Sequence, residues 1–136
     1  MKSMIVNADS IPWTSAHEVF GPNSLYEGRE VVQHKILVDR REEGGGVTYL
    51  LRFSPPPGKL LKIIATAISD EHVYLLEGGY CDKTGALLRY PGTYGLNPQG
   101  KPHSAFVGLE TTALVVYTGA PDEVHDFGVV EPIMGG

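Results

Sequence analysis

The stretch from Gly92 to His103 constrains the fold more than any other part of the chain. It reads GTYGLNPQGKPH and fits the pattern G-x5-P-x-G-x2-H. Glycine tolerates left-handed backbone conformations and proline restricts φ, so Pro98 to Gly100 predicts a tight turn between two strands. The turn leads directly to a single imidazole, that of His103, which makes this histidine the first candidate functional residue.

Short apolar segments recur along the chain and predict an all-β fold. The clearest covers residues 47–53, where Val47, Tyr49, Leu51 and Phe53 share one face. The 17 glycines and 10 prolines are spread through the 136 residues, which suits many short strands joined by turns. Other expected strands cover residues 31–38, 59–67, 72–77, 86–90, 93–96, 104–107 and 112–117. Such a set predicts a sandwich or barrel of the jelly-roll type.

Length and composition predict one domain over residues 1–136, with an N-terminal arm at 1–28 and a barrel at 29–127. We expect the arm to pack through Trp13 and Phe20, either across the body of the chain or across a partner subunit. Cys81 is the only cysteine, which excludes an internal disulfide and favours the cytoplasm. The net charge of −5 and the lack of a Lys/Arg cluster argue against nucleic acid, and no apolar run suits a membrane. A small molecule is the expected partner.

From about Val31 to Val124 the chain resembles the cupin superfamily. Besides the turn that ends at His103, the supporting segments are residues 51–58, 69–78, 80–82 and 119–123. The likeness is greatest to small single-domain bacterial cupins related to acetylacetone-cleaving dioxygenases and to the cupin domain of ChrR anti-sigma factors. This resemblance implies a double-stranded β-helix, the cupin jelly-roll barrel. By the same analogy we expect a homodimer formed through residues 31–38 and the arm.

The first motif of that family, G-x5-H-x-H-x3,4-E-x6-G, is only half present. Counting back from Gly78, its glutamate falls on Glu71, and the places of the family's two histidines fall on Ala65 and Ala67, or on Ile64 and Thr66 with the alternative spacing. The resemblance therefore implies a degenerate metal site without a tightly bound cofactor, in which only Glu71 and His103 remain.

A pocket with two methyl groups in place of two imidazoles is larger and more apolar. Burial there raises the pKa of Glu71 and suits acid–base chemistry beside His103. We therefore expect an enzyme that isomerises, epimerises or eliminates from a small oxygenated organic substrate, with His103 as base and Glu71 as acid or orienting group. The residues expected to contact the substrate are Tyr49, Arg52, Ala65, Ala67 and Tyr94; Arg52 would clamp a carboxylate if it points inward.

Two alternatives stay open. In the first, the chain is a metal-dependent, dioxygenase-like cupin whose divalent Fe, Zn, Mn or Ni is held by Glu71 and His103 together with His34 or His72. In the second, it is a non-catalytic ligand-binding or sensor cupin. Binding without turnover would distinguish the second alternative from both kinds of enzyme.

Overall fold

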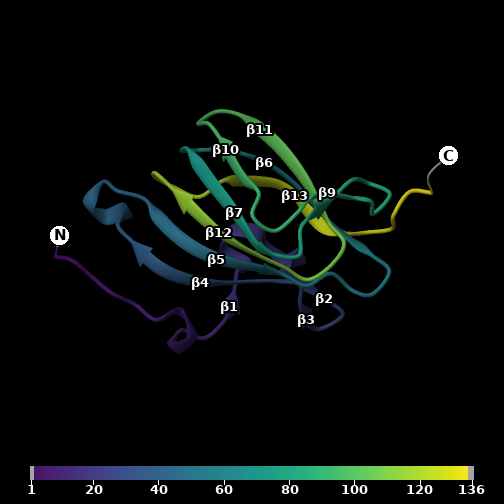
Figure 1. Ribbon diagram of the computed structural model, residues 1–136, viewed down its shortest axis with the longest axis horizontal. Coiled ribbons are helices and arrows are strands. Elements are labelled where there is room, and N and C mark those ends of the chain that lie inside the picture. The colour runs from purple at the N-terminus through teal and green to yellow at the C-terminus, as the bar shows by residue number, and fades with distance from the viewer. Residues whose placement is uncertain (1, 135–136) are drawn as a thin grey trace.

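The computed structural model describes residues 2–134, which form two antiparallel sheets facing one another (Figure 1). The larger sheet has the order β1 (Thr14–Ser15), β4 (Val32–Asp39), β5 (Val47–Phe53), β12 (Thr111–Tyr117), β7 (Glu71–Glu77) and β10 (Tyr94–Asn97). The smaller sheet has the order β13 (Glu123–Val130), β6 (Leu60–Thr66), β11 (Pro102–Val107), β8 (Tyr80–Cys81) and β9 (Leu87–Arg89). The all-β prediction is confirmed.

The remaining elements are short. A two-stranded hairpin pairs β2 (Leu25–Tyr26) with β3 (Arg29–Glu30). The helical turns are η1 (Ala8–Ser10), α1 (His17–Phe20), η2 (Pro22–Ser24) and η3 (Arg41–Glu43). Within the described residues, none of these helices is long and apolar enough to cross a membrane.

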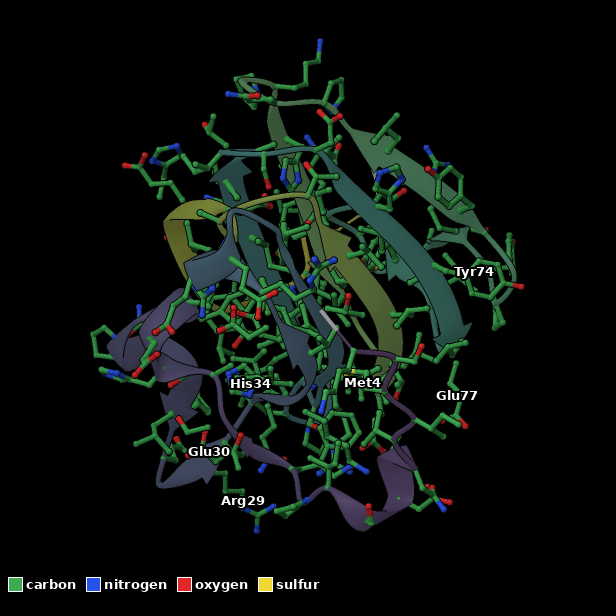
Figure 2. All side chains as sticks on the ribbon, turned by 90° about the vertical axis from the view of Figure 1, so that its left-hand side faces the viewer. Met4, Arg29, Glu30, His34, Tyr74 and Glu77 are labelled. Atoms are coloured by element: carbon green, nitrogen blue, oxygen red, sulfur yellow. The ribbon has the colours of Figure 1, made fainter. Side chains whose placement is uncertain are left out.

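The hydrophobic core lies between the two sheets because alternate side chains of each strand point inward. In β5 the predicted residues Val47, Tyr49, Leu51 and Phe53 are all buried. In β7 the same alternation buries Glu71 and Leu75 and turns Tyr74 outward (Figure 2). A register shift against β12 after Leu75 breaks the alternation, so Glu77 also projects outward. The inward face of β7 thus carries a carboxyl group into an otherwise apolar interior.

The N-terminal arm packs against the body through Trp13 and Phe20, as predicted. Phe20 is buried, with its ring 5.8 Å from that of Phe53 and 4.9 Å from that of Phe127. Trp13 covers the guanidinium of Arg52 on the outer side of the larger sheet, 4.4 Å from its ring centre. Strand β1 of the arm pairs with β4 of the same chain. The homodimer expected through this region stays a prediction.

The turn after Pro98 connects the two sheets, since β10 belongs to one and β11 to the other. Gly100 has φ of +84°, a left-handed conformation that favours glycine. Its N–H donates to the carbonyl of Ala67 over 2.7 Å, and the N–H of Lys101 donates to that of Pro98 over 3.0 Å. The predicted tight turn is confirmed, and it brings His103 opposite Ala65 of β6.

Strand β13 is not foreseen from the sequence. Its residues, EVHDFGVV, mix charged side chains with Gly128 and lack a clean alternation. The register between β13 and β6 shifts between Val124 and Asp126, so a bulge interrupts the period of two. The strand forms nonetheless, because β6 offers it an open edge and Phe127 fills the core.

Candidate active site

A cavity of about 280 Å³ lies between the two sheets. Its walls are largely apolar and include Phe20, Phe53, Ile63, Val73, Leu75 and Val115. Polar side chains line another part of it: Glu71, Asn97, His103, Tyr117 and Asp122. A small organic molecule would therefore meet an apolar surface and a group of ionisable side chains in the same space.

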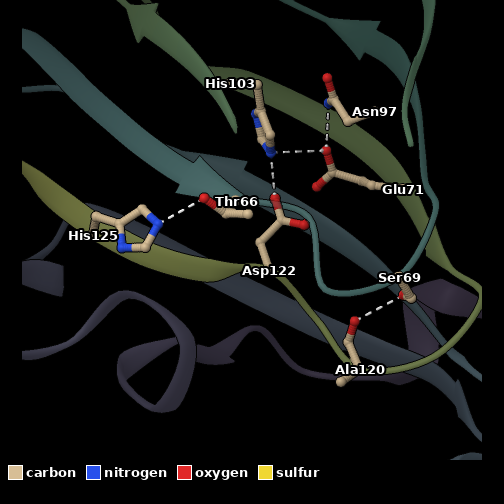
Figure 3. Close-up of polar contacts among 8 residues, drawn as sticks. All are labelled: Thr66, Ser69, Glu71, Asn97, His103, Ala120, Asp122 and His125. Atoms are coloured by element: carbon tan, nitrogen blue, oxygen red, sulfur yellow. Dashed lines mark hydrogen bonds and ion pairs between the residues drawn. The ribbon is translucent and has the colours of Figure 1, made fainter. Parts of the chain in front are cut away.

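Glu71, His103 and Asp122 converge in this cavity (Figure 3). The Nε2 atom of His103 is 2.7 Å from Oδ2 of Asp122 and 3.7 Å from Oε1 of Glu71. Asn97 donates from Nδ2 to Oε1 of Glu71 over 2.7 Å. The two carboxyl side chains are only 7% and 5% exposed, which means that they interact with each other and with the imidazole rather than with bulk water.

The pairing of the strands explains how His103 and Asp122 meet. Strand β6 lies between β11 and β13, with Ala65 opposite His103 on one side and Val124 on the other. Asp122 directly precedes β13, so its side chain approaches from the strand on the far side of β6. Alanine at position 65 leaves room above β6, and the imidazole and the carboxylate make contact across it. The small side chain of Ala65 thus leaves space for this ion pair.

Burial is the main cause that raises the pKa of Glu71 to about 7, and the nearby charge of Asp122 adds to it. Hydrogen bonding from Asn97 and Tyr117 and the charge of His103 lower that pKa, but by less. Glu71 is therefore able to exist in both protonation states near neutral pH, as the sequence-based argument on burial anticipates.

The hydrogen bond to Asp122 raises the pKa of His103, whereas burial opposes the rise and the charge of Glu71 supports it. The contact with Asp122 therefore favours the protonated imidazole, in which Nε2 donates to Oδ2 of Asp122. The second oxygen of Asp122, Oδ1, is buried and has no hydrogen-bond partner among residues 2–134. This atom is free to accept from a ligand or to contact a cation.

Two of the expected substrate contacts border the cavity, Ala65 and Tyr94. Ala65 is buried and faces inward between His103 and Val124. Tyr94 pairs with Tyr74 and turns outward with it, and its hydroxyl lies 2.6 Å from Nδ1 of His72 on the outer face. The phenol of Tyr94 therefore points away from Glu71.

The other three expected contacts lie outside the cavity. Arg52 faces the outer side of β5, where it donates to Oε1 of Gln33 over 2.8 Å beneath Trp13. Tyr49 is packed in the core, and Ala67 is held by backbone hydrogen bonds to the turn before His103. Arg52 does not reach a substrate there, because its neighbours Leu51 and Phe53 take the inward positions of β5.

His34 and His72 are not brought to Glu71 and His103. His34 lies 3.0 Å from the hydroxyl of Thr14 through Nδ1 and stacks on Tyr49. His72 follows Glu71 in β7 and so lies on the opposite face of the strand. The group of potential metal ligands found in the described residues consists instead of Glu71, His103 and Asp122, whose ligand atoms all lie within 4.8 Å of one another.

Sequence reasoning missed Asp122, Asn97, Tyr117 and Tyr80, which also line the cavity. Asn97 lies inside the motif at a position that the pattern leaves unspecified. Tyr117 is the last inward residue of an alternating strand, β12, and was therefore predictable as inward. Asp122 offered no such signal, because it lies in a loop and its neighbourhood depends on the register of β13.

Replacing Asp122 with Asn tests the ion pair directly. We expect the pKa of His103 to fall, since its strongest hydrogen-bond acceptor loses its charge, and the pKa of Glu71 to fall because a nearby like charge is gone. Both pKa values can be followed by NMR titration of the imidazole and carboxyl carbons. Asp126→Asn, at an exposed residue paired with Lys62, is the matched control. An unchanged titration of His103 in Asp122→Asn would contradict the assigned contact.

Two facing antiparallel sheets that enclose such a cavity, with His103 at the end of a glycine- and proline-rich turn, define a cupin barrel. The family model of the ChrR cupin-like domain matches residues 1–122, so the chain belongs to the ChrR cupin-like domain family. No curated protein matches the chain in sequence.

Solved structures share the fold at low identity. A cupin-like protein of unknown function from Ralstonia eutropha is 20% identical, with a TM-score of 0.60 over 87% of this chain and 68% of its own. Ectoine synthase from P. lautus is 12% identical, with a TM-score of 0.58 over 98% and 95%. The polyketide cyclase RemF from Streptomyces resistomycificus is 18% identical, with a TM-score of 0.54 over 98% and 88%. These likenesses establish the double-stranded β-helix, and both enzymes and a protein of unknown function have it.

Proposed function

We propose that this protein is a small-molecule cupin enzyme that transfers protons within an oxygenated organic substrate. The observation that carries the proposal is the convergence of Glu71 with the His103–Asp122 pair on one cavity. The shifted pKa of Glu71 is further support, because a group that titrates near neutral pH can act as both acid and base. Ectoine synthase and the RemF cyclase offer a precedent for catalysis on this fold.

In the proposed reaction, the carboxylate of Glu71 takes a proton from a C–H bond next to a carbonyl group. The electron pair of that bond moves into the carbonyl and forms an enolate, which the positive charge of His103 stabilises. If the carbon that loses the proton carries a hydroxyl group, the hydroxyl proton moves to the enolate oxygen, and return of the abstracted proton to the former carbonyl carbon completes an isomerisation. If the next carbon carries a leaving group, the electron pair of the enolate expels that group and completes an elimination. We assign the base to Glu71 rather than to His103, because Nε2 of His103 is engaged by Asp122.

Proton abstraction can be measured without knowing the full reaction. Small oxo acids and hydroxy ketones, incubated with the protein in D₂O after dialysis against a chelator, should lose their α-proton NMR signals. We expect Glu71→Gln to slow this exchange by about 100-fold or more, the usual contribution of a general base. Glu77→Gln on the exposed face of the same strand is the control and should exchange normally. Equal exchange in Glu71→Gln and wild type would rule out Glu71 as the base.

A metal-dependent activity is a second candidate, and a specific observation favours it. One imidazole and two carboxylates lie within 4.8 Å of one another, and Oδ1 of Asp122 lacks a partner among the described residues. This donor set fits a divalent cation that accepts oxygen ligands, such as Mn, Fe or Zn. Glu71, His103 and Asp122 would hold the ion, which would polarise a carbonyl oxygen when bound.

The chelator step separates the two candidates. Exchange that survives chelation and an ion content near zero support the proton-transfer enzyme. About one ion per chain by elemental analysis, together with exchange that is lost on chelation and restored by Mn or Zn, would support the metal enzyme instead. Ligand binding without exchange under any condition would support the sensor function.

A further inference from the structure

Arg89 is the only lysine or arginine among the described residues that line the cavity. It ends β9, pairs with Tyr80 of β8 and is exposed at the rim. No carboxylate of residues 2–134 lies within 4.0 Å of its guanidinium. The guanidinium makes a single protein hydrogen bond, from Nη1 to the carbonyl of Leu88 over 3.3 Å. Most of its five donors are therefore available to a ligand.

The backbone that carries Arg89 is closely held. Gly79 packs so tightly against it that an added Cβ would lie 2.1 Å from the carbonyl oxygen of Arg89. The side chain is exposed, and its starting point at the rim is set by the pairing of β8 with β9. A backbone held in place, together with a guanidinium that has unused donors, is suited to recognising one end of a bound molecule.

Arg89 lies at a different height along the strands of the barrel from Glu71, His103 and Asp122. Cys81 of β8 is opposite Phe106 of β11, and His103 precedes Phe106 by three residues in the same strand. Three residues of strand cover roughly 10 Å, and Arg89 lies about one residue further along, opposite Tyr80. The wall between the two levels includes Ile63, Val73 and Leu75, all apolar.

We infer that the cavity binds a small organic acid, whose carboxylate pairs with Arg89 and whose apolar body extends toward Glu71 and His103. A planar guanidinium matches a carboxylate with two parallel hydrogen bonds, and the apolar wall matches a short hydrocarbon or aromatic segment. The inference rests on the proposed function, since it names the substrate class for the same cavity. It transfers to Arg89 the role that the sequence suggested for Arg52.

The charges of the cavity are compatible with an anion at the rim. The positive charge of a protonated His103 offsets the negative charge of Asp122, whose Oδ2 lies 2.7 Å from Nε2 of the imidazole. The carboxyl group of Glu71 is buried, accepts a hydrogen bond from Asn97 and lies 3.7 Å from Nε2 of His103. At the rim, an entering molecule thus meets the guanidinium of Arg89, which has no carboxylate within 4.0 Å among residues 2–134.

Matched acids and amides test this inference by isothermal titration. The probes are phenylacetate with phenylacetamide and hexanoate with hexanamide, which differ in charge but hardly in shape. We expect wild type to bind the acid of at least one pair about tenfold more tightly than its amide, as a charge-assisted bidentate contact allows. Arg89→Gln should remove the difference while amide binding persists.

Arg29→Gln is the charge-matched control, because Arg29 projects from the β2–β3 hairpin away from the cavity (Figure 2). Glu71→Gln should keep the preference for acids even though it loses proton exchange. Equal binding of acid and amide by wild type, no binding of any probe, or an equal loss in Arg29→Gln would overturn the inference. An intact preference for acids in a protein that exchanges no protons would leave it standing while the proposed function fails.

Discussion

Replacing Glu71 with Gln should stabilise the protein above pH 7, although the residue lies in the candidate active site. Burial raises the pKa of Glu71 from 4.5 to about 7, so the folded state holds a proton that the unfolded chain has already released. The free energy of unfolding therefore falls as the pH rises from about 4.5 to 7, and it stays low above that. The full cost is about 3 kcal/mol.

Glutamine has no such cost and can still accept from Asn97. We expect Glu71→Gln and wild type to be about equally stable at pH 4, with Glu71→Gln more stable by about 2 to 3 kcal/mol at pH 8. His103 loses a favourable charge in the variant, which accounts for the lower end of this range. Urea unfolding at pH 4, 6 and 8 measures the difference.

The control for this experiment is Glu77→Gln, which changes an exposed glutamate of the same strand. Its stability should follow that of wild type at every pH. If Glu71→Gln were less stable than wild type at pH 8, the carboxylate would be a net stabilising group, as a bound cation would make it. That outcome would favour the metal-dependent candidate.

Gly46→Ala should destabilise the fold by about 3 kcal/mol or more, since it forces atoms into a closely packed contact. A Cβ at this position would lie 1.7 Å from the carbonyl oxygen of Tyr117, which is backbone and cannot rotate away. Gly46 directly precedes β5, where Val47 pairs with Tyr117 of β12. Relief of the clash must therefore separate the two strands at Tyr117, whose phenol reaches Glu71.

Gly95→Ala is the matched control for Gly46→Ala. An added Cβ at Gly95 of β10 has no atom within 4 Å, so we expect a change within about 0.5 kcal/mol. Thermal and urea unfolding of both variants give the comparison. Similar stabilities of Gly46→Ala and Gly95→Ala would show that β5 and β12 can move apart at little cost.

Most of the strands, and the direction of their side chains, were predictable because they depend on neighbours along the chain. Alternation identified the inward face of β5, and glycine and proline identified the turn before His103. Gly46 shows the limit of such reasoning. In the sequence GGG it is typical of a flexible hairpin tip, yet one carbonyl of β12 makes it intolerant of any side chain.

The candidate site divides in the same way. The motif spacing located Glu71 and His103. Alanine at position 65, where the family has histidine, predicted a larger pocket. The motif did not reveal Asp122, because the contact between Asp122 and His103 crosses strand β6. His103 lies in β11 and Asp122 just before β13, and both of these strands pair with β6. Arg52 and Arg89 differ likewise: both follow an apolar residue, but only the three-dimensional arrangement places Arg89 at the cavity.

The sequence by itself determined the all-β fold, the turn and the two residues on the motif positions, because these follow from side-chain alternation, backbone restriction and fixed spacing. The tertiary structure decided which third group joins them and which arginine lines the cavity. Those choices depend on the register between strands distant in sequence, and on the space that Ala65 leaves above β6. The side chains of His103 and Asp122, which are 19 residues apart in the sequence, meet because the small side chain of Ala65 leaves this space open.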